Sequence, residues 1–486
     1  MEVLLKRNQC SQTDVFEVNK QVFMVASRDI AKGELIVEEQ ALVRAPVKST
    51  LPVCLGCFTP IDWQNCIYCS NCNFPLCCDE CQQSSEHQME CQFFGNVKVD
   101  GENFNYSTFE VLYDVILPLR VLSLRETPQW NVFINLKHHL KELQQRPSWK
   151  DGHKFVIDYI TSTLKLNVSE DTILTILAID QANSFDVDFS GYKVRLLHPL
   201  SSLMEHDCLP NVARFYSGLY CGNLMQCRAA FDIKKGEKLT LSYLDLLTPL
   251  EIRQKLLKEE YFLDCKCTRC QDHSDLATNG NSLLCQKCPD GVILPGDKTC
   301  TKCKATQENS LKAISDAFKN SKEVLNDPEQ WTVEVFELFL SKYGKILHPD
   351  HVIMVQIKHK LSGFYGRLPG YSMLDMQMNP ALLERKLKLG EESLKCIEKL
   401  QPGLGTIKAL QLYENHLPIF MKAQIEMGEE PMATPEQKQE FNRAVQILEQ
   451  SIDLLKYEME GTFENSLYHG AQGKLAQLKG FIADLW

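Results

Sequence analysis

The spacing of hydrophobic residues changes several times along the chain and predicts elements of different kinds. Residues 14–45 alternate short apolar runs with turn residues, which is typical of β-strands joined by a glycine-containing turn at 28–34. From about 107 to 180 the apolar residues recur at helical spacing, and strand character returns over 184–243. The pattern therefore predicts a β fold that is interrupted by a helical insert.

The chain after residue 306 is predicted to consist of successive helices, each with one apolar face toward a core. The predicted helices span about 310–324, 331–346, 351–367, 380–400, 405–427, 435–459 and 463–484. Helix pairs of this length favour an α-solenoid of the tetratricopeptide type. A plain helical bundle is the alternative, because we find no strict repeat of about 34 residues.

Between positions 54 and 91, seven cysteines and one histidine fall into four closely spaced pairs. The pairs are Cys54 with Cys57, Cys69 with Cys72, Cys77 with Cys81, and His87 with Cys91. A gap of two or three residues lets both donors of a pair reach one Zn²⁺ from a tight turn or one helical turn. The segment therefore predicts two zinc ions, whose binding would supply folding free energy and make it a separate folding unit. A disulfide framework is the alternative, but such frameworks belong to small secreted domains.

Further cysteines predict two more zinc sites. The first would use three closely spaced cysteines and a distant fourth, for which Cys208 is the favoured candidate. The second has two Cys-x2-Cys pairs separated by eleven residues, which is typical of a small zinc ribbon. The ligands of these two sites would be Cys208, Cys265, Cys267 and Cys270, then Cys285, Cys288, Cys300 and Cys303. The chain is thus expected to bind about four Zn²⁺. Ordinary thiols are expected at Cys10, Cys66, Cys78, Cys221, Cys227 and Cys396.

The composition of the chain limits its number of domains, its binding partners and its location in the cell. The chain has 486 residues with 44% hydrophobic content, enough for two to four domains. Its formal net charge is -11 and it has no basic stripe, which argues against direct binding of nucleic acid. No apolar stretch is long enough to span a bilayer, and the charged N-terminus is not a signal peptide. We expect no membrane association and a reducing, intracellular location that is cytoplasmic and nuclear, since no cluster of basic residues favours either compartment.

Four segments match signature motifs of one known family. They are Ala26 to Glu34, Ala182 to Phe185, Glu205 to Asn211 and Lys235 to Tyr243, and Tyr261 falls on a second signature tyrosine. With the order of the cysteine groups, the chain resembles the SMYD family of SET and MYND proteins, and its ribbon is similar to the arthropod SmydA branch.

The resemblance implies an α+β multidomain fold. In it, a SET β fold is split by a MYND zinc module and a helical insert. A post-SET zinc segment, the ribbon and an all-α tetratricopeptide-like domain follow. The implied parts are SET 1–50, MYND 54–91, helical insert 100–180, SET core 181–246, post-SET 247–272, ribbon 280–305 and helical domain 306–486. In the MYND module the resemblance implies interleaved zinc sites, Cys54, Cys57, Cys77 and Cys81 on one ion and Cys69, Cys72, His87 and Cys91 on the other.

The implied activity is S-adenosylmethionine-dependent methylation of lysine in histone or other proteins. An aromatic channel would desolvate the lysine ammonium beside a sulfonium and so lower its pKa. The implied catalytic residues are Phe185, Tyr243 and Tyr261, and those implied to contact the cofactor are Val22, Phe23, Asn183, Glu205 and His206. Two cofactor motifs differ from the family. Gln21, Val22 and Phe23 replace a Gly-x-Gly turn, and Glu205 replaces an asparagine.

The alternative is an adaptor that keeps the SET fold without catalysis. The MYND module would then capture proline-containing peptides, and the helical domain would hold a partner in its concave face. Cofactor binding is the observation that separates the two hypotheses.

Overall fold

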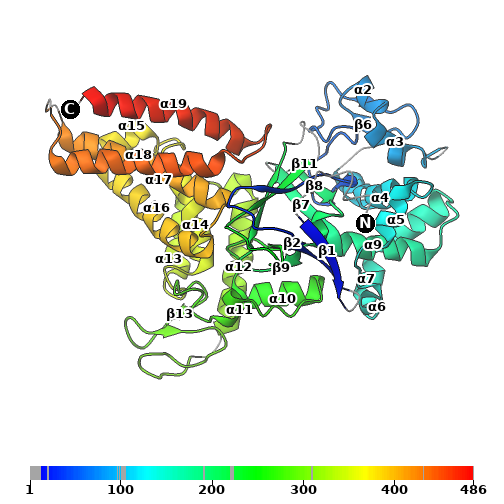
Figure 1. Cartoon of the computed structure of the whole chain (residues 1–486), viewed down its shortest axis with the longest axis horizontal. Helices are drawn as coiled ribbons and strands as arrows, with labels where there is room; N and C mark the ends of the chain where they lie inside the picture. The colour runs from blue at the N-terminus through cyan, green and yellow to red at the C-terminus, as the bar shows by residue number, and fades with distance from the viewer. Residues whose placement is uncertain are drawn as a thin grey trace.

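The computed structural model describes residues 13–18, 21–95, 97, 99, 106–189, 192–218, 224–307, 310–428, 430 and 432–484. Cys10, Cys221 and the side chain of Val22 lie outside the described part. The central strands separate two helical regions, with α4 and α9 on one side and the C-terminal helices α12 to α19 on the other (Figure 1). A β fold interrupted by helices is therefore confirmed.

The strands follow the alternating sequence pattern. Their bounds are β1 Thr13–Val18, β2 Gln21–Ala26, β3 Leu35–Gln40, β4 Val43–Pro46, β5 Ile67–Tyr68, β6 Pro75–Leu76, β7 Ser184–Phe189, β8 Tyr192–Leu197, β9 Glu205–His206, β10 Val212–Tyr216, β11 Leu224–Ala229, β12 Thr240–Leu241, β13 Leu283–Leu284 and β14 Val292–Ile293. Two three-stranded sheets have the orders β10-β11-β3 and β4-β8-β7. Strands β9 and β12 pair in parallel, with Thr240 opposite Glu205 and Leu241 opposite His206, so two predicted signature segments lie side by side.

The predicted turn at 28–34 contains Gly33 with φ of 84°, a left-handed conformation that glycine adopts without a steric penalty. A side chain at this position would also overlap the hydroxyl of Tyr457, which belongs to the C-terminal region. The guanidinium carbon of Arg228 lies 5.3 Å from the centroid of the Tyr457 ring. The C-terminal region therefore packs directly on this turn and on β11.

The helices before the ribbon lie in the cysteine module, in the predicted helical insert and in the segment after Tyr243. Their bounds are α2 Asp79–Gln82, α3 Ser85–Cys91, α4 Tyr106–Ser123, α5 Pro128–Ile134, α6 Leu140–Gln144, α7 Pro147–Gly152, α8 Lys154–Asp158, the π-helix Tyr159–Thr163, α9 Glu170–Asn183, α10 Leu250–Glu260 and α11 Thr268–Gln271. Helix α9 begins where the Ser169 side chain accepts a hydrogen bond from the amide of Thr172, a typical N-cap.

The cysteine module, residues 54–91, shares one hydrophobic core with the insert. Phe58 and Phe74 from the module belong to the same buried cluster as Ile116 of α4 and Ile176 of α9. The side chain of Arg120 on α4 is fully buried and donates to the carbonyl of Leu55 in the module at 2.6 Å. Shared apolar residues and a buried arginine therefore join the module to the rest of the chain, and its folding as a separate unit stays a prediction.

The C-terminal helices confirm the predicted periodicity. Their bounds are α12 Ser310–Asn326, α13 Val333–Tyr343, α14 Val352–Phe364, α15 Met373–Met378, α16 Pro380–Leu400, α17 Thr406–Met427, α18 Pro435–Leu455 and α19 Phe463–Asp484. Helix α15 was not predicted, although a Ser372 and Asp375 capping box begins it. Among the described helices, none combines the length and apolar character that crossing a bilayer requires.

Candidate functional site

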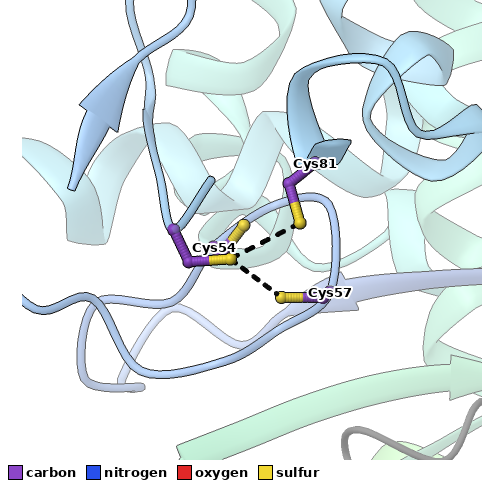
Figure 2. A group of neighbouring side chains, drawn as sticks. Cys54, Cys57 and Cys81 are labelled. Atoms are coloured by element: carbon purple, nitrogen blue, oxygen red, sulfur yellow. Dashed lines mark hydrogen bonds between the residues drawn. The ribbon is translucent and has the colours of Figure 1, made fainter. Parts of the chain in front are cut away.

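Four groups of sulfur and imidazole donors converge, and each matches one predicted zinc set. Within each group the ligand atoms all lie within 4.8 Å of one another. The groups are Cys54, Cys57, Cys77 and Cys81; Cys69, Cys72, His87 and Cys91; Cys208, Cys265, Cys267 and Cys270; and Cys285, Cys288, Cys300 and Cys303. Figure 2 shows the sulfurs of Cys54, Cys57 and Cys81 turned toward one another. Four soft donors at this spacing fit tetrahedral Zn²⁺, so the prediction of about four ions is confirmed.

The histidine ligand is oriented by a buried chain of charges. Nδ1 of His87 lies 2.8 Å from a carboxylate oxygen of Glu90, which leaves Nε2 facing Cys72 at 3.6 Å. The other oxygen of Glu90 accepts from Nε of Arg120 at 2.6 Å, and all three side chains are 0% exposed. Partners of this kind fix the tautomer of a zinc-binding histidine. The same Arg120 also donates to the carbonyl of Arg44 on β4, so this zinc site is tied to the central strands.

The third zinc site lies beneath the candidate channel. Cys208 follows β9, while Cys265, Cys267 and Cys270 follow Tyr261. Arg253 and Arg269 lie beside it, both 1% exposed, and Nε of Arg269 lies 2.8 Å from the fully buried carboxylate of Asp275. Four thiolates on one Zn²⁺ carry a net negative charge, and these buried guanidinium groups offset it. Since Arg253 belongs to α10, which ends just before Tyr261, the zinc site holds one wall of the channel.

The three residues implied to be catalytic line one cavity. The rings of Tyr243 and Tyr261 have centroids 5.0 Å apart, and both residues border a cavity of about 430 Å³ together with Phe185. The Tyr243 hydroxyl donates to the carbonyl of Met204 at 2.8 Å. Burial raises the pKa of Tyr243 well above its usual value, so the phenol stays protonated at neutral pH. The arrangement can enclose an alkyl amine between aromatic rings.

Several polar atoms of the residues implied to contact the cofactor already have partners. Asn183 lines the cavity, yet its amide nitrogen donates to the carbonyls of Lys137 and Ile179 at 2.7 Å. The amide of Tyr243 donates to Nδ1 of His206 at 3.0 Å, and Nε2 of this ring lies 3.2 Å from the sulfur of Cys208. Burial lowers the pKa of His206 to about 4, so the ring is neutral. The face of the ring and the amide oxygen of Asn183 remain for a ligand.

The two altered motifs meet at one lysine that sequence reasoning missed. The ammonium of Lys238 lies 2.7 Å from the carboxylate of Glu205 and 4.5 Å from the centroid of the Phe23 ring. Lys238 lies inside the matched segment that ends at Tyr243, but its partners are more than thirty residues away in sequence. An ion pair of this kind complements a zwitterionic amino acid, whose carboxylate and ammonium carry the opposite charges. The donor set therefore fits the methionine end of S-adenosylmethionine.

Comparison with known proteins agrees with this geometry. Residues 21–244 match the family model of the SET domain. This chain contains a SET domain. The matched range includes two of the three residues implied to be catalytic, Phe185 and Tyr243, together with the two altered cofactor motifs.

The relatives of the chain are SET domain proteins. The SET domain-containing protein SmydA-8, isoform A, of Drosophila melanogaster is 29% identical over 287 residues, which cover 56% of this chain and 58% of that protein. The N-lysine methyltransferase SMYD2 of Gallus gallus is 24% identical, over 70% of this chain and 75% of that protein. The resemblance to the SMYD family and its SmydA branch is therefore confirmed. The match spans less than two thirds of the length of SmydA-8.

A solved structure of the SET domain of LSMT bound to lysine and AdoHcy aligns with 88% of this chain and 92% of its own. The two share 11% of their residues and the TM-score is 0.32, a likeness too low to support an argument about the site.

Proposed function

We propose that this protein transfers a methyl group from S-adenosylmethionine to lysine side chains of histone or other proteins. The observation that carries the proposal is the pair of partly buried tyrosines, Tyr243 and Tyr261, which border one cavity with Phe185. Relatives that carry the name N-lysine methyltransferase support the same reaction. We also propose that the module over 54–91 is a MYND module and that residues 247–272 form the post-SET segment.

The channel residues act on the lysine. The aromatic rings that border the cavity would displace water from the ammonium and so favour its neutral, nucleophilic form. Protonated Tyr243 cannot act as a general base, because burial holds the pKa of its phenol well above neutral pH. Its hydroxyl is held by the carbonyl of Met204, so its position is fixed before the amine enters. The lysine proton leaves to water, and the tyrosine rings orient the nitrogen lone pair along the line of attack.

The cofactor, when bound, supplies an electrophilic methyl group on a sulfonium. Lys238 would pair with its carboxylate and Glu205 with its ammonium, which exchanges the internal ion pair for two ion pairs with the ligand. The Phe23 ring holds the Lys238 ammonium through a cation–π contact and so favours the internal pair of Lys238 with Glu205 over pairing with the ligand. The face of the His206 ring closes the site toward Tyr243, since the ring centroids are 5.1 Å apart.

A radiolabelled methyl-transfer assay on a panel of lysine peptides and core histones tests the proposal. Label should enter lysine, and replacement of the target lysine by arginine should abolish it. A wild-type protein with four bound zinc ions that transfers no label to any peptide or histone would contradict the proposal.

The adaptor remains a second candidate, because an internal ion pair occupies the altered cofactor motifs. The module over 54–91 exposes Trp63 and Tyr68, with 48% and 43% of their surfaces accessible. Exposed aromatic rings of this kind bind proline-containing segments. We propose that such peptides bind here whether or not the chain is catalytic, and that the protein acts in both cytoplasm and nucleus.

A further inference from the structure

Arg214 lies where three cavities meet. It belongs to β10, the edge strand of its sheet, and its guanidinium carbon is 5.2 Å from the centroid of the Phe185 ring. Arg214 borders the channel cavity of about 430 Å³. Arg214 also borders two further cavities, a cleft of about 510 Å³ toward the loop that joins α16 and α17 and a hollow of about 540 Å³ beside Glu458. Arg214 therefore borders the channel cavity and both of the cavities next to it.

Most of the charged groups that line these cavities with Arg214 are engaged with other residues. Arg195 pairs with both Asp180 and Asp186, at 2.9 and 2.7 Å. Three further acids have partners as follows: Asp245 with Lys322 at 3.3 Å, Glu260 with Gln181 at 3.0 Å, and Glu458 with Thr406 at 2.6 Å. Within the described part of the chain, no residue forms a hydrogen bond or ion pair with the Arg214 side chain, which is partly exposed, and its Nη1 is buried without a partner.

A guanidinium nitrogen that is buried without an acceptor is unfavourable, because it has lost its hydrogen bonds to water and forms none with the protein. The planar guanidinium matches a carboxylate, which can accept two parallel hydrogen bonds from it. The Phe185 ring holds the guanidinium in place and also lines the channel. The unpaired Nη1 of Arg214 is therefore close to the cavity in which the target lysine would bind. The ligand that completes this pairing is therefore part of the substrate.

We propose that Arg214 selects substrates that carry an aspartate or glutamate within a few residues of the target lysine. The proposal rests on the proposed methyltransferase function and adds the chemical class of the substrate sequence. The overall charge of the chain, -11, disfavours acidic peptides, so long-range electrostatics cannot produce this preference. A preference for an acidic neighbour must come from a local cation at the site.

The test measures binding and methyl transfer with matched peptides in the full-length, zinc-loaded protein. Fluorescence anisotropy compares lysine peptides that carry aspartate or asparagine at each of three positions on either side of the lysine. Initial rates of methyl transfer are recorded on the same pairs. At its best position the aspartate peptide should bind the wild type about tenfold more tightly than its asparagine twin.

The variants separate charge from structure. Arg214→Gln should abolish the discrimination between the twins, Arg214→Lys should keep part of it, and Arg214→Glu should prefer a peptide with lysine in place of the aspartate. The matched control is Arg125→Gln, since Arg125 also lies over an aromatic ring, Trp130 at 5.5 Å, but in the helical insert. It should discriminate as the wild type does. Zinc content and circular dichroism confirm that each variant is folded.

Equal binding of both twins by the wild type at every position would overturn the proposal, as would discrimination that survives in Arg214→Gln. The outcomes also distinguish this proposal from the proposed function. Discrimination in binding without any methyl transfer would refute the enzyme and keep the acidic-peptide site. Methyl transfer that ignores the neighbouring charge would keep the enzyme and refute the role of Arg214.

Discussion

The aromatic channel and the cofactor side of the site lie on neighbouring strands, but different interactions hold them in place. Tyr243 and Tyr261 are packed against the core around the third zinc site and are partly or fully enclosed. Lys238 and Glu205, by contrast, pair at the surface, where 53% and 39% of their side chains are exposed. The channel therefore depends on folding and metal, whereas the cofactor side depends on a screened ion pair that a ligand can rearrange.

The largest effect is expected from removing a ligand of the third zinc site. Cys208→Ser should bind three zinc ions instead of four, lose metal-binding free energy on the order of 10 kcal/mol and loosen the channel wall. Elemental analysis and thermal unfolding measure both changes. Cys66→Ser is the control and should keep four ions, because Cys66 belongs to none of the four groups. Four ions in Cys208→Ser would refute the assignment of this ligand.

The next effect concerns the channel alone. Tyr243→Phe removes the hydroxyl held by Met204 and should lower the rate of methyl transfer about 100-fold, because misplacing the amine costs that much. The affinity for S-adenosylmethionine should stay close to that of the wild type. Single-turnover rates at saturating cofactor, with calorimetry alongside, separate the two. If the variant lost both the affinity for S-adenosylmethionine and the rate of methyl transfer, the channel and the cofactor side would not be independent of each other.

A smaller effect is expected on the cofactor side. Lys238→Ala should weaken binding of S-adenosylmethionine about tenfold, since one charged hydrogen bond to the ligand is lost. The unfolding free energy should change by less than about 1 kcal/mol, because the pair is half exposed. Lys234→Ala is the matched control, since Lys234 pairs with Asp29 at 3.0 Å on the same turn. Equal affinity in both variants would mean that Lys238 does not meet the cofactor.

The smallest effect is on the shape of the pH profile. Burial raises the pKa of Tyr243 above its ordinary value of 10.0, so the phenol should not ionise between pH 8 and about 10. The rate should rise over this range as the substrate lysine loses its proton, without a falling limb from Tyr243. Initial rates in overlapping buffers, with stability checked at each pH, give the profile. A decline that begins below pH 10 while the protein stays folded would place Tyr243 in a more polar environment than the structure shows.

The sequence predicted the zinc sites well because ligand spacing is a local property. Even the distant Cys208 could be assigned, since a group of three cysteines needs a fourth donor. Helix periodicity likewise predicted α16, α17 and α19 closely, because propensity and one apolar face act along a single helix.

The contacts that sequence reasoning missed are long-range and charged. Lys238 with Glu205, Arg120 with Glu90, and Arg214 with Phe185 each join segments that no local pattern connects. Periodicity marks such residues as surface positions, and only the folded chain shows which of them are buried or paired. The consequence was largest for the module over 54–91, whose spacing suggested independence although its core is shared.

The central claim is that the chain holds S-adenosylmethionine beside the Tyr243 channel despite its altered motifs. Isothermal titration calorimetry of the zinc-loaded wild type and of Phe23→Gly with S-adenosylmethionine tests this claim most directly. The account predicts weak but measurable binding in the wild type and tighter binding in Phe23→Gly, where no aromatic ring on β2 holds Lys238 in its internal ion pair. Absence of binding in both proteins would contradict the enzyme and leave the adaptor.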